Sequence, residues 1–205
     1  MKIIKAKDYE DMSRKAANII SAQVILKPDC VLGLATGSTP IVPTSSSLLV
    51  REGDVDFAEV STYNLDEYRG LSHDDPQSYH YFMRENFFDH INIDLNNTHV
   101  PDGSNPDAAA ACSEYDKIVA AAGYPDLQLL GIGNNGHIGF NEPDDHFSKG
   151  THCVDLTEST IQPTAACSTA STMFPSGLHH GYPDHHVCPH DPGRRQRRGQ
   201  GSGRA

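Results

Sequence analysis

The chain has 205 residues, 37% of them hydrophobic, and a formal net charge of −11. This length suits one domain with a substantial core, and the acidic balance argues against nucleic acid or an anionic membrane as a partner. No apolar run reaches the roughly 20 residues that span a bilayer, and the five cysteines lack the paired spacing of a metal site. We therefore expect a reduced, cytoplasmic setting.

The hydrophobic pattern predicts helices and strands that alternate along the chain. Residues 8–27 have apolar side chains at helical spacing and end before Pro28. The remaining predicted elements are a strand at 31–35, a helix at 42–51, a strand at 60–65, helices at 77–89 and 106–122, and strands at 127–132 and 154–156. Such alternation predicts an α/β sandwich with a mainly parallel sheet.

Polar segments follow three of the predicted strands, where open α/β sheets bind their ligands. The first segment is Thr36-Gly37-Ser38-Thr39. Its hydroxyl and backbone N–H groups fit an anion such as phosphate, although an ordinary turn has the same composition. Because the segment lacks the lysine of a P-loop, it does not indicate a nucleoside triphosphate.

The second segment contains the adjacent acids Asp66 and Glu67. Acids after a strand often cap a helix or lie in solvent, and one that faces a cleft can serve as a general base. The third segment runs from Gly131 to Pro143 and places His137 five residues before Glu142 in a glycine-rich turn. A histidine and a carboxylate on a tight turn after a buried strand indicate an active-site loop.

Four motifs, in register and in order, resemble the glucosamine-6-phosphate deaminase family. They are Leu34 to Pro40, Asn64 to Tyr68 with Pro76 to Tyr79 after it, Phe82 to His90, and Gly131 to Pro143. The likeness extends over residues 1–161. It implies a Rossmann-like αβα sandwich and a reaction that converts glucosamine 6-phosphate and water to fructose 6-phosphate and ammonia, with no cofactor and no metal.

The resemblance also implies a role for each matched residue. His137 would assist opening of the pyranose ring, with Glu142 orienting the imidazole. Asp66 would move the C2 proton to C1, and residues 36–39 would hold the 6-phosphate of this small-molecule substrate. Many family members carry Asp where this chain has Asn135, whose amide can orient the ring without adding charge. The family includes monomers and allosteric hexamers, so the resemblance is compatible with a homo-oligomer.

The chain departs from the family after residue 161, although the family would continue with an arginine, a further strand and a lysine. Residues 162–205 contain no isoleucine or lysine and are rich in Pro, His, Ser, Gly and Arg, a composition that predicts disorder. Residues 179–197, read one base later with allowed codons, can encode an apolar strand. We therefore interpret 1–161 as an incomplete deaminase-like domain and 162–205 as a disordered, frameshifted tail. Two weaker interpretations are that the histidines of the tail form a zinc site and that its arginines bind nucleic acid.

Two alternative functions remain open from the sequence. A 6-phosphogluconolactonase-like hydrolase would have similar loops, but we expect it to carry Asp-Glu-Arg and Gly-Asp-Gly-His segments in place of those seen here. The other alternative is a non-catalytic remnant, because a sheet that lacks strands exposes an apolar face and a strand edge.

Overall fold

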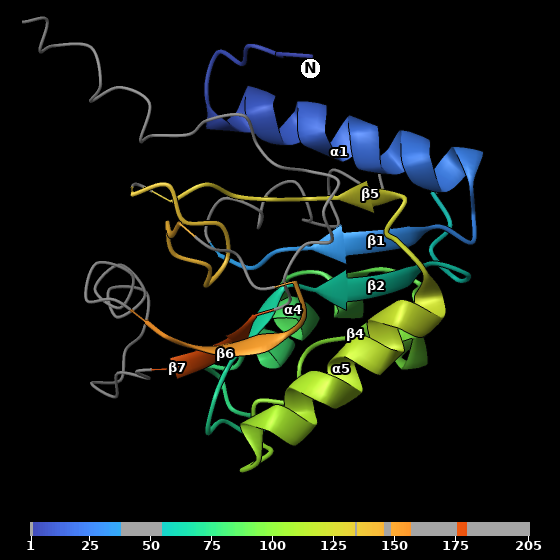
Figure 1. Ribbon diagram of the computed structural model, residues 1–205. Helices are drawn as coiled ribbons and strands as arrows, with labels where there is room; N and C mark the ends of the chain where they lie inside the picture. The colour runs from blue at the N-terminus through green and yellow to red at the C-terminus, as the bar shows by residue number, and fades with distance from the viewer. Residues whose placement is uncertain (1, 38–54, 134, 146–148, 157–175, 180–205) are drawn as a thin grey trace, which may run out of the picture.

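Four parallel strands form the central sheet of the protein. The computed structural model describes residues 2–37, 55–133, 135–145, 149–156 and 176–179. The strands are β1 (Val31–Leu34), β2 (Ser61–Asn64), β4 (Thr98–His99) and β5 (Leu127–Gln128), in the spatial order β4-β2-β1-β5. Every neighbouring pair is parallel, so the carboxyl ends of the strands meet at one edge of the sheet (Figure 1).

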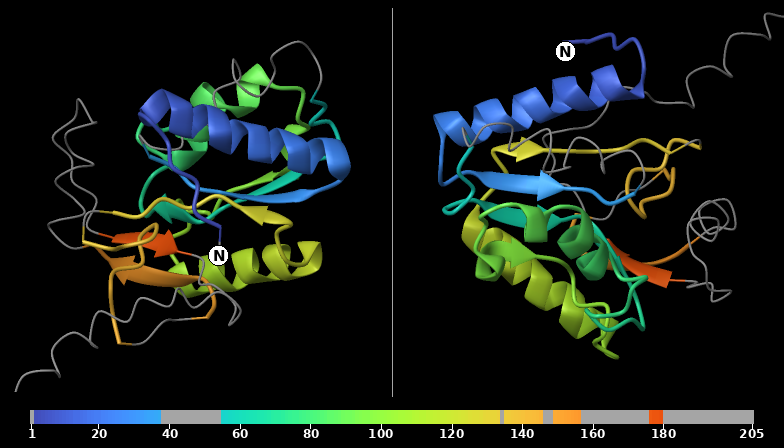
Figure 2. Two further views of the ribbon diagram at one scale, coloured as in Figure 1. Left: turned by 90° about the horizontal axis from the view of Figure 1, so that it is seen from above. Right: turned by 180° about the vertical axis from the view of Figure 1, so that it is seen from behind.

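Helices cover both faces of this sheet, as Figure 2 shows. Helices α1 (Tyr9–Leu26) and α4 (Tyr79–Asn86) lie on one face, and α5 (Ala108–Ala122) lies on the other. Short 3₁₀ turns follow α4 at η2 (Phe88–His90) and η3 (Leu95–Asn97). None of the helices in the described ranges is long and apolar enough to cross a membrane.

The main core lies between the sheet and the face that carries α1 and α4. It contains buried side chains from α1, β1, the segment before β2 and α4. Phe57 and Phe87 are fully buried there in an edge-to-face pair, with ring centroids 5.8 Å apart. On the opposite face α5 buries Ala111, Cys112 and Tyr115. The predicted αβα sandwich with a mainly parallel sheet is confirmed.

A second, antiparallel sheet lies beyond the carboxyl edge of the first. Its strands are β3 (Asp66–Tyr68), β7 (Ser176–His179) and β6 (His152–Asp155), with β7 in the middle. Residues 66–68 were expected in a loop but pair with β7 in the register Asp66↔His179. The sequence did not indicate this strand because three residues carry no readable periodicity.

Residues 176–179 differ from the disorder that their composition predicts, since they form β7. Backbone N–H and C=O groups supply the pairing with β3 and β6, so the strand does not require an apolar sequence. The rest of the tail, with its other histidines and its arginines, lies outside the described residues. The predicted helix at 42–51 also lies outside them.

Candidate active site

Asp66 follows β2 at the carboxyl edge of the central sheet and is the first residue of β3. The backbone here crosses from one sheet to the other, because Leu65 N–H still donates to the Leu34 carbonyl. Asp66 is 4% exposed, and its Oδ1 lies 3.4 Å from the Thr36 hydroxyl oxygen. The structure therefore brings the first and second polar segments together.

The first segment turns sharply at Gly37, whose φ of +121° favours glycine. Thr36 and Gly37 are partly exposed beside β1. Ser38 and Thr39, the other two predicted phosphate-binding residues, lie outside the described residues. Their role in binding phosphate stays a prediction.

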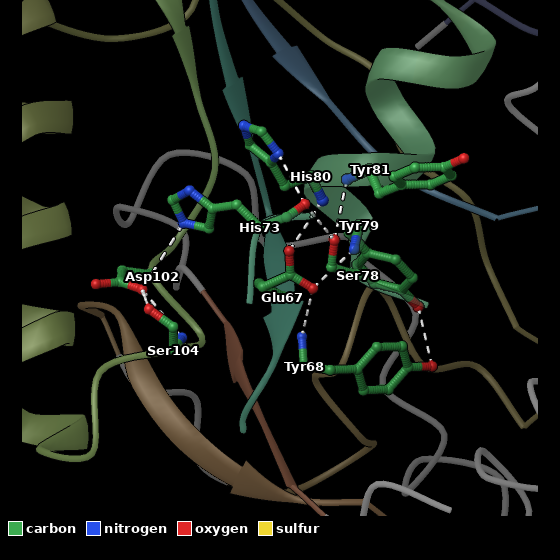
Figure 3. A network of polar contacts seen from close by, with 9 residues as sticks. All are labelled: Glu67, Tyr68, His73, Ser78, Tyr79, His80, Tyr81, Asp102 and Ser104. Carbon is green, nitrogen blue, oxygen red and sulfur yellow. Dashed lines mark hydrogen bonds and ion pairs between the residues drawn. The ribbon is translucent and has the colours of Figure 1, made fainter. Parts of the chain in front are cut away.

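The side chain of Glu67 points toward the start of α4, as Figure 3 shows. Its Oε1 accepts hydrogen bonds from the backbone N–H groups of Tyr68 and Tyr79, both at 2.8 Å, and its Oε2 accepts from the backbone N–H of His80 at 2.9 Å. Burial raises the pKa of Glu67 to about 7, and the three N–H donors oppose that shift. One of the two adjacent acids thus caps a helix, and the other lies at the candidate site.

The third segment forms a compact turn after β5. Gly133 N–H donates to the His137 carbonyl at 2.8 Å, and Ile138 and Asn141 exchange two backbone hydrogen bonds at 3.1 Å. Gly136 and Gly139 have φ values of +93° and +59°, in the left-handed region that glycine adopts readily. The turn folds the ring of His137 over Gly133, into the space that a Cβ atom at residue 133 would need.

In the structure the amide of Asn135 lies between His137 and Glu142. His137 Nδ1 lies 2.6 Å from Asn135 Oδ1, and Asn135 Nδ2 donates to Glu142 Oε2 at 2.6 Å. An ionised carboxylate only accepts, so Glu142 fixes the amide with its oxygen toward the imidazole. Nδ1 then carries the proton, which leaves Nε2 as the atom that can accept one from a substrate.

An aromatic cluster connects the third segment to the second. Phe140 is buried, and its ring centroid lies 4.9 Å from that of Tyr68 and 5.5 Å from that of Tyr79. Leu71, Leu156 and Val154 complete the cluster. Packing of this kind holds the His137 turn against β3 and α4, so loops far apart in the sequence share one apolar base.

Tyr79 is a site residue that the sequence analysis did not assign. Its hydroxyl donates to the Tyr68 hydroxyl at 3.2 Å and lies near the Thr36 side chain. Burial raises the pKa of Tyr79 well above its usual range, so the phenol stays a neutral hydrogen-bonding group. Its place in the Pro76 to Tyr79 motif was the only signal in the sequence.

These groups define a class of site. A buried carboxylate and a tautomer-fixed imidazole at the carboxyl edge of a parallel sheet are suited to proton transfer on a small substrate. The profile of the family described as glucosamine-6-phosphate isomerases/6-phosphogluconolactonase matches residues 6–166. The chain belongs to this family.

Individual relatives within this family give a more specific comparison. Over 167 residues the chain is 60% identical to a glucosamine-6-phosphate deaminase of Lachnoclostridium phytofermentans, covering 80% of this chain and 70% of the relative. It is 55% identical over 163 residues to the protein of the same name from Halothermothrix orenii, covering 79% and 68%. Some other relatives are covered to only 64% of their length.

Solved structures agree with these sequence matches. A monomeric glucosamine-6-phosphate deaminase superposes with a TM-score of 0.84 and 42% identity, over 88% of this chain and 76% of the other. A 6-phosphogluconolactonase from Thermotoga maritima superposes with a TM-score of 0.64 at 21% identity, over 87% and 75%. At that identity the second likeness shows a shared fold alone.

Proposed function

We propose that the protein is a glucosamine-6-phosphate deaminase, which converts glucosamine 6-phosphate and water to fructose 6-phosphate and ammonia. The observation that carries this proposal is a series of contacts in which Glu142 binds Asn135 and Asn135 binds His137. Phe140 packs this turn against the strand that bears Asp66. Relatives with this name are 48 to 60% identical to the chain. The lactonase-like alternative has support from the fold alone.

The proposed roles are those that the resemblance to the deaminase family implies, and the geometry of the groups supports them. Nε2 of His137 accepts the proton of the anomeric hydroxyl and returns a proton to the ring oxygen, which opens the pyranose ring. Asp66 then takes the C2 proton and delivers it to C1, the transfer that an aldose–ketose isomerisation requires. Asn135 and Glu142 orient the imidazole. Hydrolytic loss of ammonia from C2 completes the reaction.

Thr36, Gly37, Ser38 and Thr39 are proposed to hold the 6-phosphate. The position of Thr36 supports this proposal, because its hydroxyl oxygen lies 3.4 Å from the carboxylate of Asp66, the proposed base. No cofactor enters the proposed chemistry, and no step requires a metal. We further propose that the reaction takes place in the cytoplasm.

Substitution of the two proposed proton-transfer groups tests the function. Purified wild type should release ammonia and fructose 6-phosphate in equal amounts from glucosamine 6-phosphate. Asp66→Asn and His137→Gln should each lower kcat by roughly 100-fold or more, because each removes a general acid–base group. Glu114→Gln, an exposed acid on α5, is the matched control and should retain activity.

Two results would refute the proposal. The first is a folded wild-type protein that releases no ammonia, which would favour a non-catalytic remnant. The second is hydrolysis of 6-phosphogluconolactone without any deamination, which would favour the lactonase.

A further inference from the structure

Glu67 is a buried carboxylate that the proposed reaction does not use. It is 1% exposed, and among the described residues no lysine or arginine forms an ion pair with it. Gly103 packs against its side chain, since a methyl group added to Gly103 would come within 3.0 Å of Glu67 Cγ. Burial of a carboxylate is costly unless hydrogen bonds compensate it, so its retention calls for a structural or functional reason.

The three backbone donors around Glu67 come from two different elements. Tyr68 belongs to β3, whereas Tyr79 and His80 are the first two residues of α4. The first N–H groups of a helix have no partner within the helix, and its N-terminus favours negative charge. Glu67 therefore joins the strand that carries Asp66 to the start of the helix that carries Tyr79.

Helix capping alone does not explain Glu67, because Glu67 belongs to β3 and α4 also has a cap within its own segment. Ser78 is the N-cap residue, and its hydroxyl accepts from Tyr81 N–H at 3.0 Å while donating to the His73 carbonyl at 3.0 Å. The contribution specific to Glu67 is the connection across to β3.

Both elements that Glu67 joins, β3 and α4, carry residues of the candidate site. Side chains alternate along a strand, so Asp66 and Tyr68 share the face opposite Glu67. Tyr79 returns to the same region through its hydroxyl, which contacts Tyr68 and Thr36. A shift of α4 relative to β3 would move the hydroxyl of Tyr79 away from the surroundings of Asp66.

We propose that Glu67 is a positioning residue for the deaminase reaction. It clamps β3 to the N-terminus of α4 and so fixes the position of Asp66 relative to Tyr79. This inference rests on the proposed function. Glu67 does not touch the substrate and transfers no proton to it. Its effect is on the geometry of the proton transfer, where a displacement of about 1 Å can cost 100-fold in rate.

Glu67→Gln tests the clamp with little change in shape. The Gln amide keeps one acceptor oxygen but turns an NH₂ group toward one of the backbone N–H donors. We expect kcat to fall roughly 10- to 100-fold, with KM within about threefold of wild type, because Thr36 and Gly37 are untouched. We also expect the Tyr79 and His80 amides to lose protection from hydrogen exchange.

Ser78→Ala is the matched control, because it removes a cap of the same helix without touching Glu67. It should expose the Tyr81 amide while kcat stays within about twofold of wild type. Equal losses of kcat in the two variants would show that Glu67 only stabilises α4 and would overturn the proposal. Full protection of the Tyr79 and His80 amides in Glu67→Gln would overturn it too.

The hydrogen-exchange measurement separates this inference from the proposed function. If wild type releases no ammonia, the deaminase proposal fails, and amide protection alone decides whether the clamp exists. If Glu67→Gln does not fold, Glu67→Asp keeps the charge but shortens its reach. That variant should show the same loss of kcat, and wild-type activity in it would contradict the clamp.

Discussion

At the scale of single residues, Asn135 connects the imidazole to the carboxylate of the third segment. The resemblance implies that Glu142 orients His137, and the structure places the amide of Asn135 between them, with contacts of 2.6 Å on each side. An amide transmits orientation, since its donor and acceptor ends are distinct. The carboxylate of Glu142 therefore reaches the imidazole through the amide of Asn135.

Asn135→Leu removes this connection while keeping the branched shape and the number of non-hydrogen atoms of the side chain. We expect kcat to fall at least tenfold, because the imidazole loses its fixed tautomer and a ring-opening step needs a correctly protonated Nε2. Stability should change little, as Asn135 is exposed. Steady-state kinetics at saturating substrate measure the effect, and Asn18→Leu on the exposed side of α1 is the control. Unchanged kcat would contradict the orienting role.

The raised pKa of Glu67 leads to a prediction about stability. Burial, the largest cause, raises the pKa from 4.5 to about 7, so between these pH values the folded protein binds more protons than the unfolded chain. The stability contributed by the protonated group is complete below pH 4.5 and is lost as the pH rises through 7. Relative to Glu67→Gln, which does not titrate, the free energy of unfolding should fall by about 3 kcal/mol.

Urea denaturation of both proteins between pH 4 and pH 8 measures this difference. Two parallel stability curves would mean that Glu67 titrates with its ordinary pKa. If the free energy of unfolding of wild type falls relative to that of Glu67→Gln as the pH rises, the ionised carboxylate costs stability at neutral pH, where it is the stronger acceptor for its three N–H donors. A residue kept at such a cost fits a functional role.

At the scale of elements, long periodic segments were predictable and short paired ones were not. Helices α1 and α5 and strands β1 and β2 agree with their predicted ranges to within a few residues, because each buries a face large enough to leave a periodic pattern. Strands β3, β4 and β7 have two to four residues, and only their neighbours define them. The predicted strand at 127–132 pairs over only Leu127–Gln128.

The same distinction explains the candidate site. The sequence indicated His137, Glu142 and the acid pair Asp66 and Glu67, because chemically reactive side chains follow predicted strands. Only the resemblance to the family favoured Asp66 over Glu67. Tyr79 and the role of Glu67 depend on how α4 packs against β3, a contact between segments that no local pattern encodes. Phe140 looks like an ordinary apolar residue in the sequence, yet its ring joins the His137 turn to β3 and α4.

The glycine turn after β5 provides a test at this scale. A methyl group added to Gly133 would lie 2.2 Å from the His137 ring, whereas one added to Gly131 would meet nothing within 4 Å. Gly133→Ala should therefore displace the imidazole and lower kcat roughly 100-fold, and Gly131→Ala should be close to wild type. Comparable activity in the two variants would show that the ring can move without loss of function.

At the scale of the whole molecule, the formal net charge changes from negative to positive at the end of the family-like region. Residues 1–161 carry 11 Lys+Arg and 25 Asp+Glu, and residues 162–205 carry five Arg and two Asp. The family profile matches residues 6–166. A body with a formal charge of −14 needs local positive groups to hold a dianionic phosphate, and Thr36 and Gly37 offer hydroxyl and backbone donors without a formal charge. The sequence beyond residue 161 therefore bears directly on substrate affinity.

This reasoning leads to a prediction about the gene. We expect the coding sequence from codon 158 onward to open, by a single-base shift near codon 162, into a frame that encodes an apolar strand and a lysine. The shift would replace a polar, lysine-free tail with a strand that can join the sheet and a cation that can bind phosphate. Nucleotide sequencing through and past codon 205 tests this prediction.

The restored protein should have a lower KM for glucosamine 6-phosphate than the 205-residue chain at similar kcat, since phosphate contacts away from the reacting carbons bind ground and transition states equally. If every shifted frame soon ends in a stop codon, the tail is genuine, and Thr36 and its neighbours must hold the phosphate without that lysine.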